Sequence, residues 1–172
     1  MPFYVSGETK DWHQLTHRTE FPAGIELLSD HRAAEIESDR KIVRARSYAG
    51  LAVTLGYDKL IIATGAKPVI PDISGIDLVH PMHTMSHAFK VHEKIASGKI
   101  HKAAIVGVGY IGIEMADALT HRGIEVELVG RSDSVLPTVD PAIGGHIRVE
   151  LQKHGVRVRT GIAVDQVRRR NG

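Results

Sequence analysis

Short runs of apolar residues separated by turn residues fill the first third of the chain. They occupy residues 25–29, 31–37, 41–47 and 51–55, and the second and third flank a turn at residues 38–41. Runs of this length, bounded by glycine and polar residues, are typical of β-strands joined by tight turns. This part of the chain is therefore expected to be β-rich and to contain a small antiparallel sheet.

A continuous apolar run at residues 60–63 predicts a different kind of strand. It contains no polar position, which suits a strand buried on both faces of a sheet, and Thr64-Gly65 ends it. The proline-rich stretch at residues 67–77 then favours a stiff, extended connection. We expect the chain to cross from one domain to another in this stretch, with a boundary between residues 78 and 79.

After the proline-rich stretch the pattern changes to an alternation of strands and helices. Ser86 is the expected N-cap of a helix at residues 87–97, and Asp140 with Pro141 begins another helix at residues 142–154. The remaining expected elements are a helix at residues 110–122 and strands at residues 103–107, 124–129, 156–160 and 163–169. This order predicts an α/β fold, with a Rossmann-like parallel sheet and helices on both faces.

Composition and charge narrow the possible functions. Twenty-two basic residues balance 20 acidic ones, which argues against a nucleic-acid partner or a membrane partner. No apolar run approaches the ~20 residues of a membrane span, and the opening residues do not resemble a signal peptide, so a cytoplasmic location is expected. The chain contains no cysteine, which excludes disulfides, thiolate metal sites and a redox thiol within it.

Four histidines lie close together in the sequence, at His80, His83, His87 and His92. Their spacings do not keep them on one helical face, and no carboxylate repeat accompanies them. Because zinc sites are normally more regular, no metal site is expected.

The motif G-x-G-x-x-G occupies Gly107, Gly109 and Gly112, between an expected strand and an expected helix. The first glycine permits a tight turn, the second lets phosphates approach the backbone, and the third permits close packing of helix on strand. Free N–H groups at the start of the helix would receive the negative charge of a pyrophosphate. Val108, Tyr110 and Ile111 complete this candidate dinucleotide-binding turn. The alternative is a turn with a structural role only.

The end of the second strand bears on the choice between NADH and NADPH. A carboxylate about 20 residues after the first glycine would bind the ribose hydroxyls of NAD, but Gly130 stands there, followed by Arg131 and Ser132. The missing acid and the adjacent guanidinium favour the 2′-phosphate of NADPH. Two alternatives remain: Arg131 points to solvent or stacks on adenine, or Asp133 reaches the ribose.

Three segments together resemble a known family. The segments YDKLIIATGAKPVIP, AAIVGVGYIGIEMADAL and VELVGRSDSVLPTVDP are similar to those of the FAD- and NAD(P)-dependent pyridine nucleotide-disulfide oxidoreductases. Within that family, the branch of coenzyme A-disulfide reductases, NADH oxidases and NADH peroxidases is the most similar. The resemblance implies that residues 1–78 are part of an FAD-binding domain, and that residues 79–172 are an NAD(P)-binding Rossmann domain that is incomplete at its C-terminus.

The resemblance also implies roles for individual residues. Ala63, Thr64 and Gly65 would lie near the flavin nucleotide, Tyr110 would shield the flavin until nicotinamide displaces it, and Glu114 would belong to the nicotinamide pocket. Without the resemblance, Tyr110 is a boundary aromatic residue and Glu114 an exposed helix charge. A likeness of fold leaves these roles as analogies.

The implied activity is transfer of a hydride from NAD(P)H to FAD, and onward to a disulfide or to oxygen, in a homodimer. The segment at residues 2–7 resembles the one that follows the redox cysteine in the coenzyme A-disulfide branch, and Asn171-Gly172 is a hairpin signal without a return strand. The chain is therefore expected to be an internal piece, inactive alone. Two alternatives stay open: a reductase that feeds rubredoxin, ferredoxin or a nitrite-reducing partner, and a non-catalytic nucleotide-binding fragment.

Overall fold

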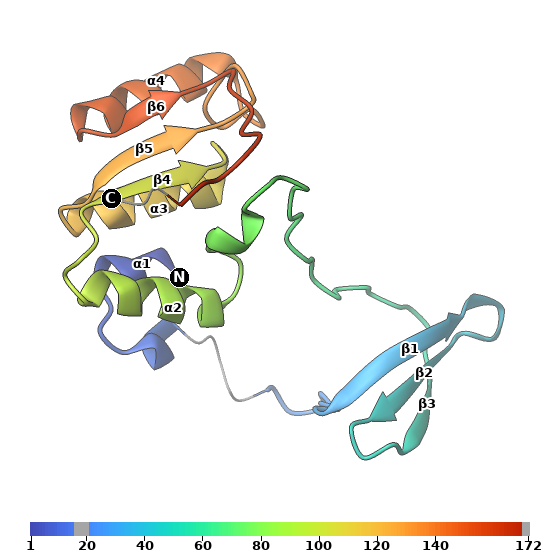
Figure 1. Ribbon diagram of the computed structural model, residues 1–172. Coiled ribbons are helices and arrows are strands. Elements are labelled where there is room, and N and C mark those ends of the chain that lie inside the picture. Colours follow the sequence, from blue (N-terminus) through green and yellow to red (C-terminus); the bar gives the residue numbers. More distant parts are fainter. Residues whose placement is uncertain (16–20, 170–172) are drawn as a thin grey trace. The chain divides into compact units, whose positions relative to one another are not determined.

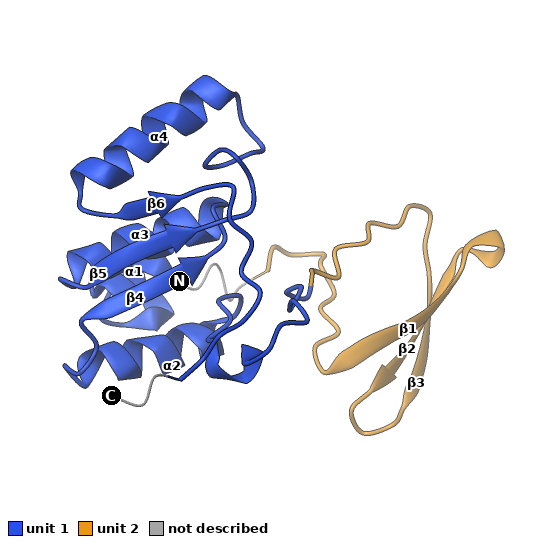
Figure 2. Cartoon of the chain, turned by 45° about the horizontal axis from the view of Figure 1, so that its top comes forward, with its two compact units in different colours: residues 1–16, 67–172 blue, residues 17–66 orange. Residues whose placement is uncertain are grey.

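The computed structural model describes residues 1–15 and 21–169, and the chain divides into two compact units (Figure 2). The first unit comprises Met1–Thr16 and Lys67–Gly172, and the second comprises His17–Ala66. The break near residue 66 precedes the boundary expected between residues 78 and 79, and the N-terminal residues join the unit that holds the parallel sheet. The assignment of residues 1–78 to an FAD-binding domain stays a prediction.

The second unit is built around the antiparallel sheet that the sequence predicts. Its strands run in the order β1-β2-β3 and span His31–Glu37, Ile42–Ser47 and Ala52–Gly56. A short 3-10 turn joins the first two strands, and Lys41 adopts the left-handed conformation there, with φ 51°. The run at residues 25–29, which was also expected to be β, forms no strand.

The apolar run at residues 60–63 does not form the expected buried strand. These residues have no regular secondary structure, and the side chain of Ile61 is 87% exposed. A strand buried on both faces needs neighbouring strands for its N–H and C=O groups and layers above and below it. No described strand pairs with residues 60–63, so the prediction of a buried strand there is wrong.

The first unit contains the parallel sheet that the strand–helix alternation predicts (Figure 1). Strands β4 (Lys102–Val106), β5 (Glu125–Val129) and β6 (Arg157–Arg159) lie in that order, with parallel pairing throughout. Helix α3 (Tyr110–His121) connects β4 to β5, and α4 (Pro141–Lys153) precedes β6. Asp140 caps α4 as expected, because its carboxylate accepts the N–H of Ala142 at 2.8 Å.

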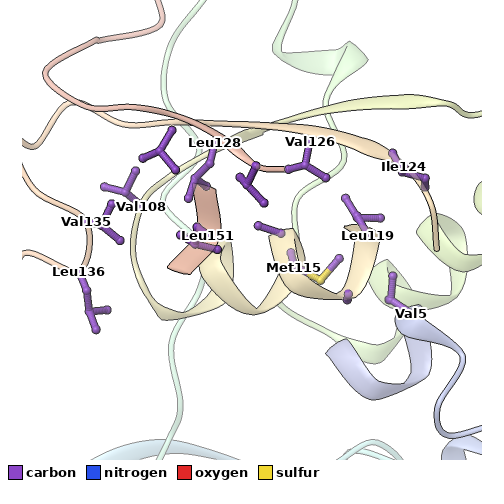
Figure 3. Packing of buried hydrophobic residues seen from close by; sticks show 14 of the residues in the cluster. Val5, Val108, Met115, Leu119, Ile124, Val126, Leu128, Val135, Leu136 and Leu151 are labelled. Atoms are coloured by element: carbon purple, nitrogen blue, oxygen red, sulfur yellow. The ribbon is translucent and has the colours of Figure 1, made fainter. Parts of the chain in front are cut away.

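One face of the sheet carries the hydrophobic core (Figure 3). Side chains of Val126 and Leu128 point from β5 toward α3, where Met115 and Leu119 meet them, and Leu151 of α4 joins the same buried cluster. Alternate residues of the strands face this way, which is the burial pattern of strands covered on one side.

The opposite face of the sheet is charged. Glu125 pairs with Lys102 at 3.0 Å and with Arg157, while Glu127 pairs with Arg157 and Arg159. These hydrogen bonds hold the pKa of the Glu125 carboxyl below its ordinary value. The α/β class and the parallel sheet are confirmed. Helices were expected on both faces of the sheet, but the described helices contribute buried side chains to one face only. Polar residues alternate with apolar ones in β5 and β6, and they form this second face.

Two further helices complete the core of the first unit. Helix α1 (Pro2–Ser6) places Val5, which is fully buried, in the core cluster, and it packs against α3 and α2 (Met85–Ala96). The ring of Tyr4 lies 5.5 Å from Phe89 and 4.6 Å from His92, measured between centroids. Aromatic contacts of this kind stabilise the packing beyond simple area burial.

Helix α2 begins two residues before the position that the sequence suggests. Its N-cap is Thr84 rather than Ser86, because Thr84 and His87 form a reciprocal pair. The N–H of His87 donates to Thr84 Oγ1 at 3.4 Å, and the N–H of Thr84 donates to His87 Nδ1 at 3.3 Å. Histidine thus takes the place that glutamate or glutamine usually holds in a capping box.

The C-terminal stretch also differs from expectation. Residues 163–169 form a single parallel bridge, between Gln166 and Ser74, instead of a strand, and the N–H of Val167 donates to the carbonyl of Ser74 at 2.8 Å. The short 3-10 helix Ile76–Leu78 follows this contact. The predicted hairpin at Asn171-Gly172 lies outside the described residues. Within residues 1–15 and 21–169, no helix is long and apolar enough to cross a membrane.

Candidate dinucleotide-binding site

The glycine motif forms the turn between β4 and α3, at the carboxyl end of the parallel sheet. Gly107 extends the sheet by donating its N–H to the carbonyl of Val129 at 2.8 Å, and its φ of 123° favours a residue without a side chain. Gly109 is the N-cap of α3 and lacks a side chain that could cap the helix. The first N–H groups of α3 have no intrahelical acceptor and are available to an anion.

Gly112 brings the first turn of α3 against the strand. A Cβ built on it would lie closer than 3.0 Å to the carbonyl oxygen of Gly107, nearer than side chains come in real proteins. The same Cβ would lie 3.5 Å from Leu128 of β5. The third glycine therefore has the packing role that the motif predicts.

Gly109 faces open space. A Cβ on this residue would meet no atom of the described chain within 4 Å, and its backbone conformation is extended, with φ −86° and ψ −173°. A side chain could therefore be built here without strain, so the fold does not require glycine at this position. The presence of glycine is explained if a ligand occupies that space, because a side chain would then keep the ligand out.

Val108 is the part of the turn that faces inward. Within residues 107–112, all of which are described, only Val108 is buried. Its two methyl groups lie 2.6 Å from the position that a Cβ of Gly130 would take. A carboxylate side chain at residue 130 would therefore collide with Val108, which gives a steric reason for the glycine at the end of β5.

The loop after β5 places Arg131 and Ser132 beside the turn. Backbone bonds hold this loop to the end of β6: Gly130 donates to the carbonyl of Arg159 at 2.9 Å, and the carbonyl of Ser132 accepts from Gly161 at 2.8 Å. The side chain of Arg131 is exposed and that of Ser132 is half-buried. A guanidinium and a hydroxyl are thus held at the edge of the sheet where the glycine turn also lies.

Three further candidate residues are exposed in the first turns of α3. Tyr110 is 60% exposed and Ile111 is also exposed, while Glu114 follows Tyr110 by one helical turn and is exposed as well. Residues four apart on a helix share a face. The structure therefore brings Tyr110 and Glu114 together at the turn.

The candidate flavin residues belong to the other unit. Ala63, Thr64 and Gly65 are exposed and have no regular secondary structure, and Gly65 has a φ of 72°. The structure leaves their expected role as a prediction.

The histidine cluster has structural contacts. His87 caps α2 and His92 lies against Tyr4. Burial and the nearby ammonium groups of Lys94 and Lys90 lower the pKa of His80, in that order of importance. In the part of the chain that is described, no three histidine, aspartate or glutamate side chains are grouped so as to hold a metal ion.

Sequence reasoning missed two residues that support the turn from the inside. Leu136 has a φ of 53° and donates its N–H to the carbonyl of Val108 at 2.8 Å. Gly144 lets the backbone of α4 contact the carbonyl of Val135, the residue before Leu136. A leucine in the left-handed conformation has no sequence signal, whereas two adjacent glycines inside an expected helix are a signal of close backbone packing.

Known proteins are similar to nearly the whole chain. The profile of the family described as pyridine nucleotide-disulphide oxidoreductase matches residues 4–172. An NADH oxidase from Enterococcus faecalis is 35% identical over 170 residues, which cover 95% of this chain and 38% of the relative. A CoA-dependent NAD(P)H sulfur oxidoreductase from Pyrococcus furiosus is 38% identical over 135 residues, covering 76% of this chain and 30% of the relative. The chain thus spans about a third of the length of these relatives.

A solved structure has the same fold. It is an engineered water-forming NADPH oxidase bound to NADPH, a mutant of the NADH oxidase of Lactobacillus brevis. The TM-score is 0.74 at 26% identity, covering 96% of this chain and 38% of that one. Among its substitutions, three successive residues change from aspartate to alanine, from alanine to arginine and from methionine to serine. With a family profile that matches almost every residue, this chain belongs to the pyridine nucleotide-disulphide oxidoreductase family.

Proposed function

We propose that this chain is the nicotinamide-dinucleotide-binding portion of a flavoprotein oxidoreductase. Its relatives include an NADH oxidase and an NAD(P)H sulfur oxidoreductase, and the chain spans about a third of each. Bound NAD(P)H would supply a hydride for reduction of FAD, and the electrons would pass on to a disulfide or to oxygen. The observation that carries the proposal is the open space at Gly109, beside the free N–H groups of α3.

The chain's own residues bind and orient the dinucleotide. N–H groups at the start of α3 donate to the pyrophosphate, and the helix dipole adds to their attraction. Gly107 and Gly112 set the shape of the turn, and the bare backbone of Gly109 lets the phosphates approach. Val108 stays buried and anchors the turn to the core.

NADPH is the preferred cofactor in this proposal. Gly130, Arg131 and Ser132 repeat the order of residue types that the engineered NADPH oxidase acquired: a small residue, arginine and serine. Arg131 is exposed, so its guanidinium can pair with a 2′-phosphate in a bidentate arrangement. A carboxylate that would repel this phosphate is sterically excluded at residue 130.

Tyr110 and Glu114 are proposed to act at the nicotinamide end of the cofactor. Both are exposed on one face of α3, at the turn, where they can contact a bound dinucleotide. In this proposal the Tyr110 ring covers the flavin until nicotinamide displaces it, and Glu114 orients the nicotinamide. Ala63, Thr64 and Gly65 are proposed to contact FAD, and the enzyme to act as a cytoplasmic homodimer. In a longer enzyme that contains this chain, flavin absorbance would test the binding of FAD, and sedimentation would test the homodimer.

Titration of the purified chain with NADPH, followed by calorimetry, tests the proposal. Gly109→Val fills the open space without strain, so the variant should fold like the wild type and lose binding. Gly56→Val is a matched control, since Gly56 also has no described atom within 4 Å of its Cβ position and ends β3 in the other unit. Wild-type protein that binds neither NADPH nor NADH, or a Gly109→Val variant that binds as well as wild type, would overturn the proposal.

A further inference from the structure

Val108 connects the candidate binding turn to the rest of the first unit. Its side chain is buried against Gly130, and its carbonyl accepts the N–H of Leu136 at 2.8 Å. The position of the turn therefore depends on the loop that contains Leu136. The exposed side of the turn stays open, since no described atom lies within 4 Å of the Cβ position of Gly109.

Leu136 holds an unfavourable backbone conformation. Its φ is 53°, a value that branched and bulky residues rarely adopt, and its side chain is 5% exposed. Such strain persists only where the surrounding structure fixes the residue, and it is concentrated at functional sites. In this conformation the N–H of Leu136 points at Val108, and its carbonyl accepts the N–H of Val139 at 3.1 Å.

Helix α4 fixes the loop from the other side. A Cβ on Gly144 would lie closer than 3.0 Å to the carbonyl oxygen of Val135, the residue before Leu136. The helix backbone thus rests directly against this carbonyl. The neighbouring Gly145 is different, because it is exposed and a Cβ there would meet no described atom within 4 Å.

We propose that Gly144 and Leu136 are positioning residues for the dinucleotide-binding turn. The contacts run from the backbone of α4 at Gly144 to Val135, from Leu136 to the carbonyl of Val108, and so to the turn. Neither residue touches the ligand. This inference rests on the proposed binding of NADPH, and it adds that the geometry of the turn is set by α4, which follows it in the chain.

The test compares two adjacent substitutions in the full chain. Gly144→Ala pushes on the carbonyl of Val135, and we expect NADPH affinity to fall by up to about 100-fold, the loss that a misplacement of about 1 Å can cause. The amide signals of Gly107, Val108 and Gly109 should shift in the NMR spectrum of the folded variant. Gly145→Ala adds the same atoms to open space, and should leave both affinity and these signals unchanged.

Hydrogen exchange in the wild type decides the matter if Gly144→Ala does not fold. NADPH should slow exchange of the Leu136 amide, which does not touch the ligand, more than exchange of the Ile124 amide, which bonds to Leu119. A folded Gly144→Ala variant with wild-type affinity and unshifted turn signals would overturn the inference, as would unchanged exchange at Leu136 with NADPH bound. Wild-type protein that binds neither NADPH nor NADH would instead refute the proposed function.

Discussion

Gly112 lies so close to the carbonyl oxygen of Gly107 that no side chain fits between them. The contact joins the first turn of α3 to the end of β4 through backbone atoms alone. The Cβ position of Gly109, by contrast, has no described atom within 4 Å. Because backbone is less able to move aside than a side-chain tip, this relationship should tolerate little change.

Gly112→Ala should destabilise the protein by about 1–3 kcal/mol, the usual cost of forcing extra volume into a packed site. Urea unfolding of the parallel-sheet unit measures this cost. Gly145→Ala is the control, since Gly145 also lies inside a helix and the added methyl group meets open space, so the free energy of unfolding should not fall. Equal stability of the two variants would show that the backbone contact is looser than the structure has it.

Arg131→Gln should weaken binding of NADPH and leave binding of NADH almost unchanged. A hydrogen-bonded charge contributes about 1.5–3 kcal/mol, so the affinity for NADPH should fall about tenfold or more. Calorimetric titrations with both cofactors give the two dissociation constants. Arg46→Gln, at an exposed position of β2, serves as the control for loss of one positive charge. A parallel fall for both cofactors would argue against a 2′-phosphate contact.

Val5→Ala should lower the free energy of unfolding by about 2 kcal/mol, because it removes two buried methyl groups and leaves a cavity. Phe3→Ala on the same helix should cost less, since Phe3 is 56% exposed. Chemical denaturation of both variants makes the comparison. If the smaller change at Val5 cost less than the larger one at Phe3, α1 would not be docked against α2 and α3.

Thr84→Ala should destabilise α2 by about 1 kcal/mol, the usual value of a lost N-cap. Ser86→Ala should have a much smaller effect, because Ser86 is exposed and lies inside the helix. Thermal unfolding of the two variants distinguishes the observed start of α2 from the start that the sequence suggests. A larger loss of stability for Ser86→Ala than for Thr84→Ala would show that Ser86 is the N-cap, as the sequence suggests.

The ion pairs of Glu125 should make stability depend on pH in the acid range. Hydrogen bonds from Lys102 and then from Arg157 lower the folded-state pKa of this carboxyl from its ordinary value of 4.5. A carboxyl with a lowered pKa stabilises the fold above the unfolded-state value, and this contribution is lost as the pH falls below about 4.5 through the folded-state value. Glu125→Gln should therefore flatten the acid limb of a stability–pH curve.

Glu93→Gln, at an exposed position of α2, provides the comparison for that measurement. Its acid limb should follow the wild type. The effect of Glu125→Gln should also shrink in high salt, because the pairs on the sheet are exposed and salt screens exposed charges. An acid limb for Glu125→Gln that is as steep as that of the wild type would contradict the prediction.

Local patterns were enough to predict the parallel sheet and the glycine turn. The apolar strand before Gly107, the helix that follows and the capping pair Asp140-Pro141 each depend on neighbours within a few residues. The start of α2 was missed because the reciprocal bonds of Thr84 and His87 use a histidine where the usual pattern has glutamate or glutamine.

Other features depend on contacts between distant segments. The apolar residues at 60–63 predicted a buried strand, but burial requires partner strands that the run itself does not specify. The alternation of Glu125 and Glu127 with valine and leucine indicates a charged second face, although helices were expected on both faces of the sheet. The conformation of Leu136 is set by its partners and has no local signature.

The burial of Val108 within the turn limits how the preference between NADPH and NADH can be changed. The methyl groups of Val108 occupy the space that a side chain at residue 130 would need. An acidic residue that favours NADH therefore cannot be introduced at residue 130 unless Val108 is changed as well. Substitutions are tolerated more easily at the next two positions, because Arg131 is exposed and Ser132 is half-buried. Laboratory evolution toward NADH should therefore first accumulate changes at these two positions and leave the residue beneath the turn untouched.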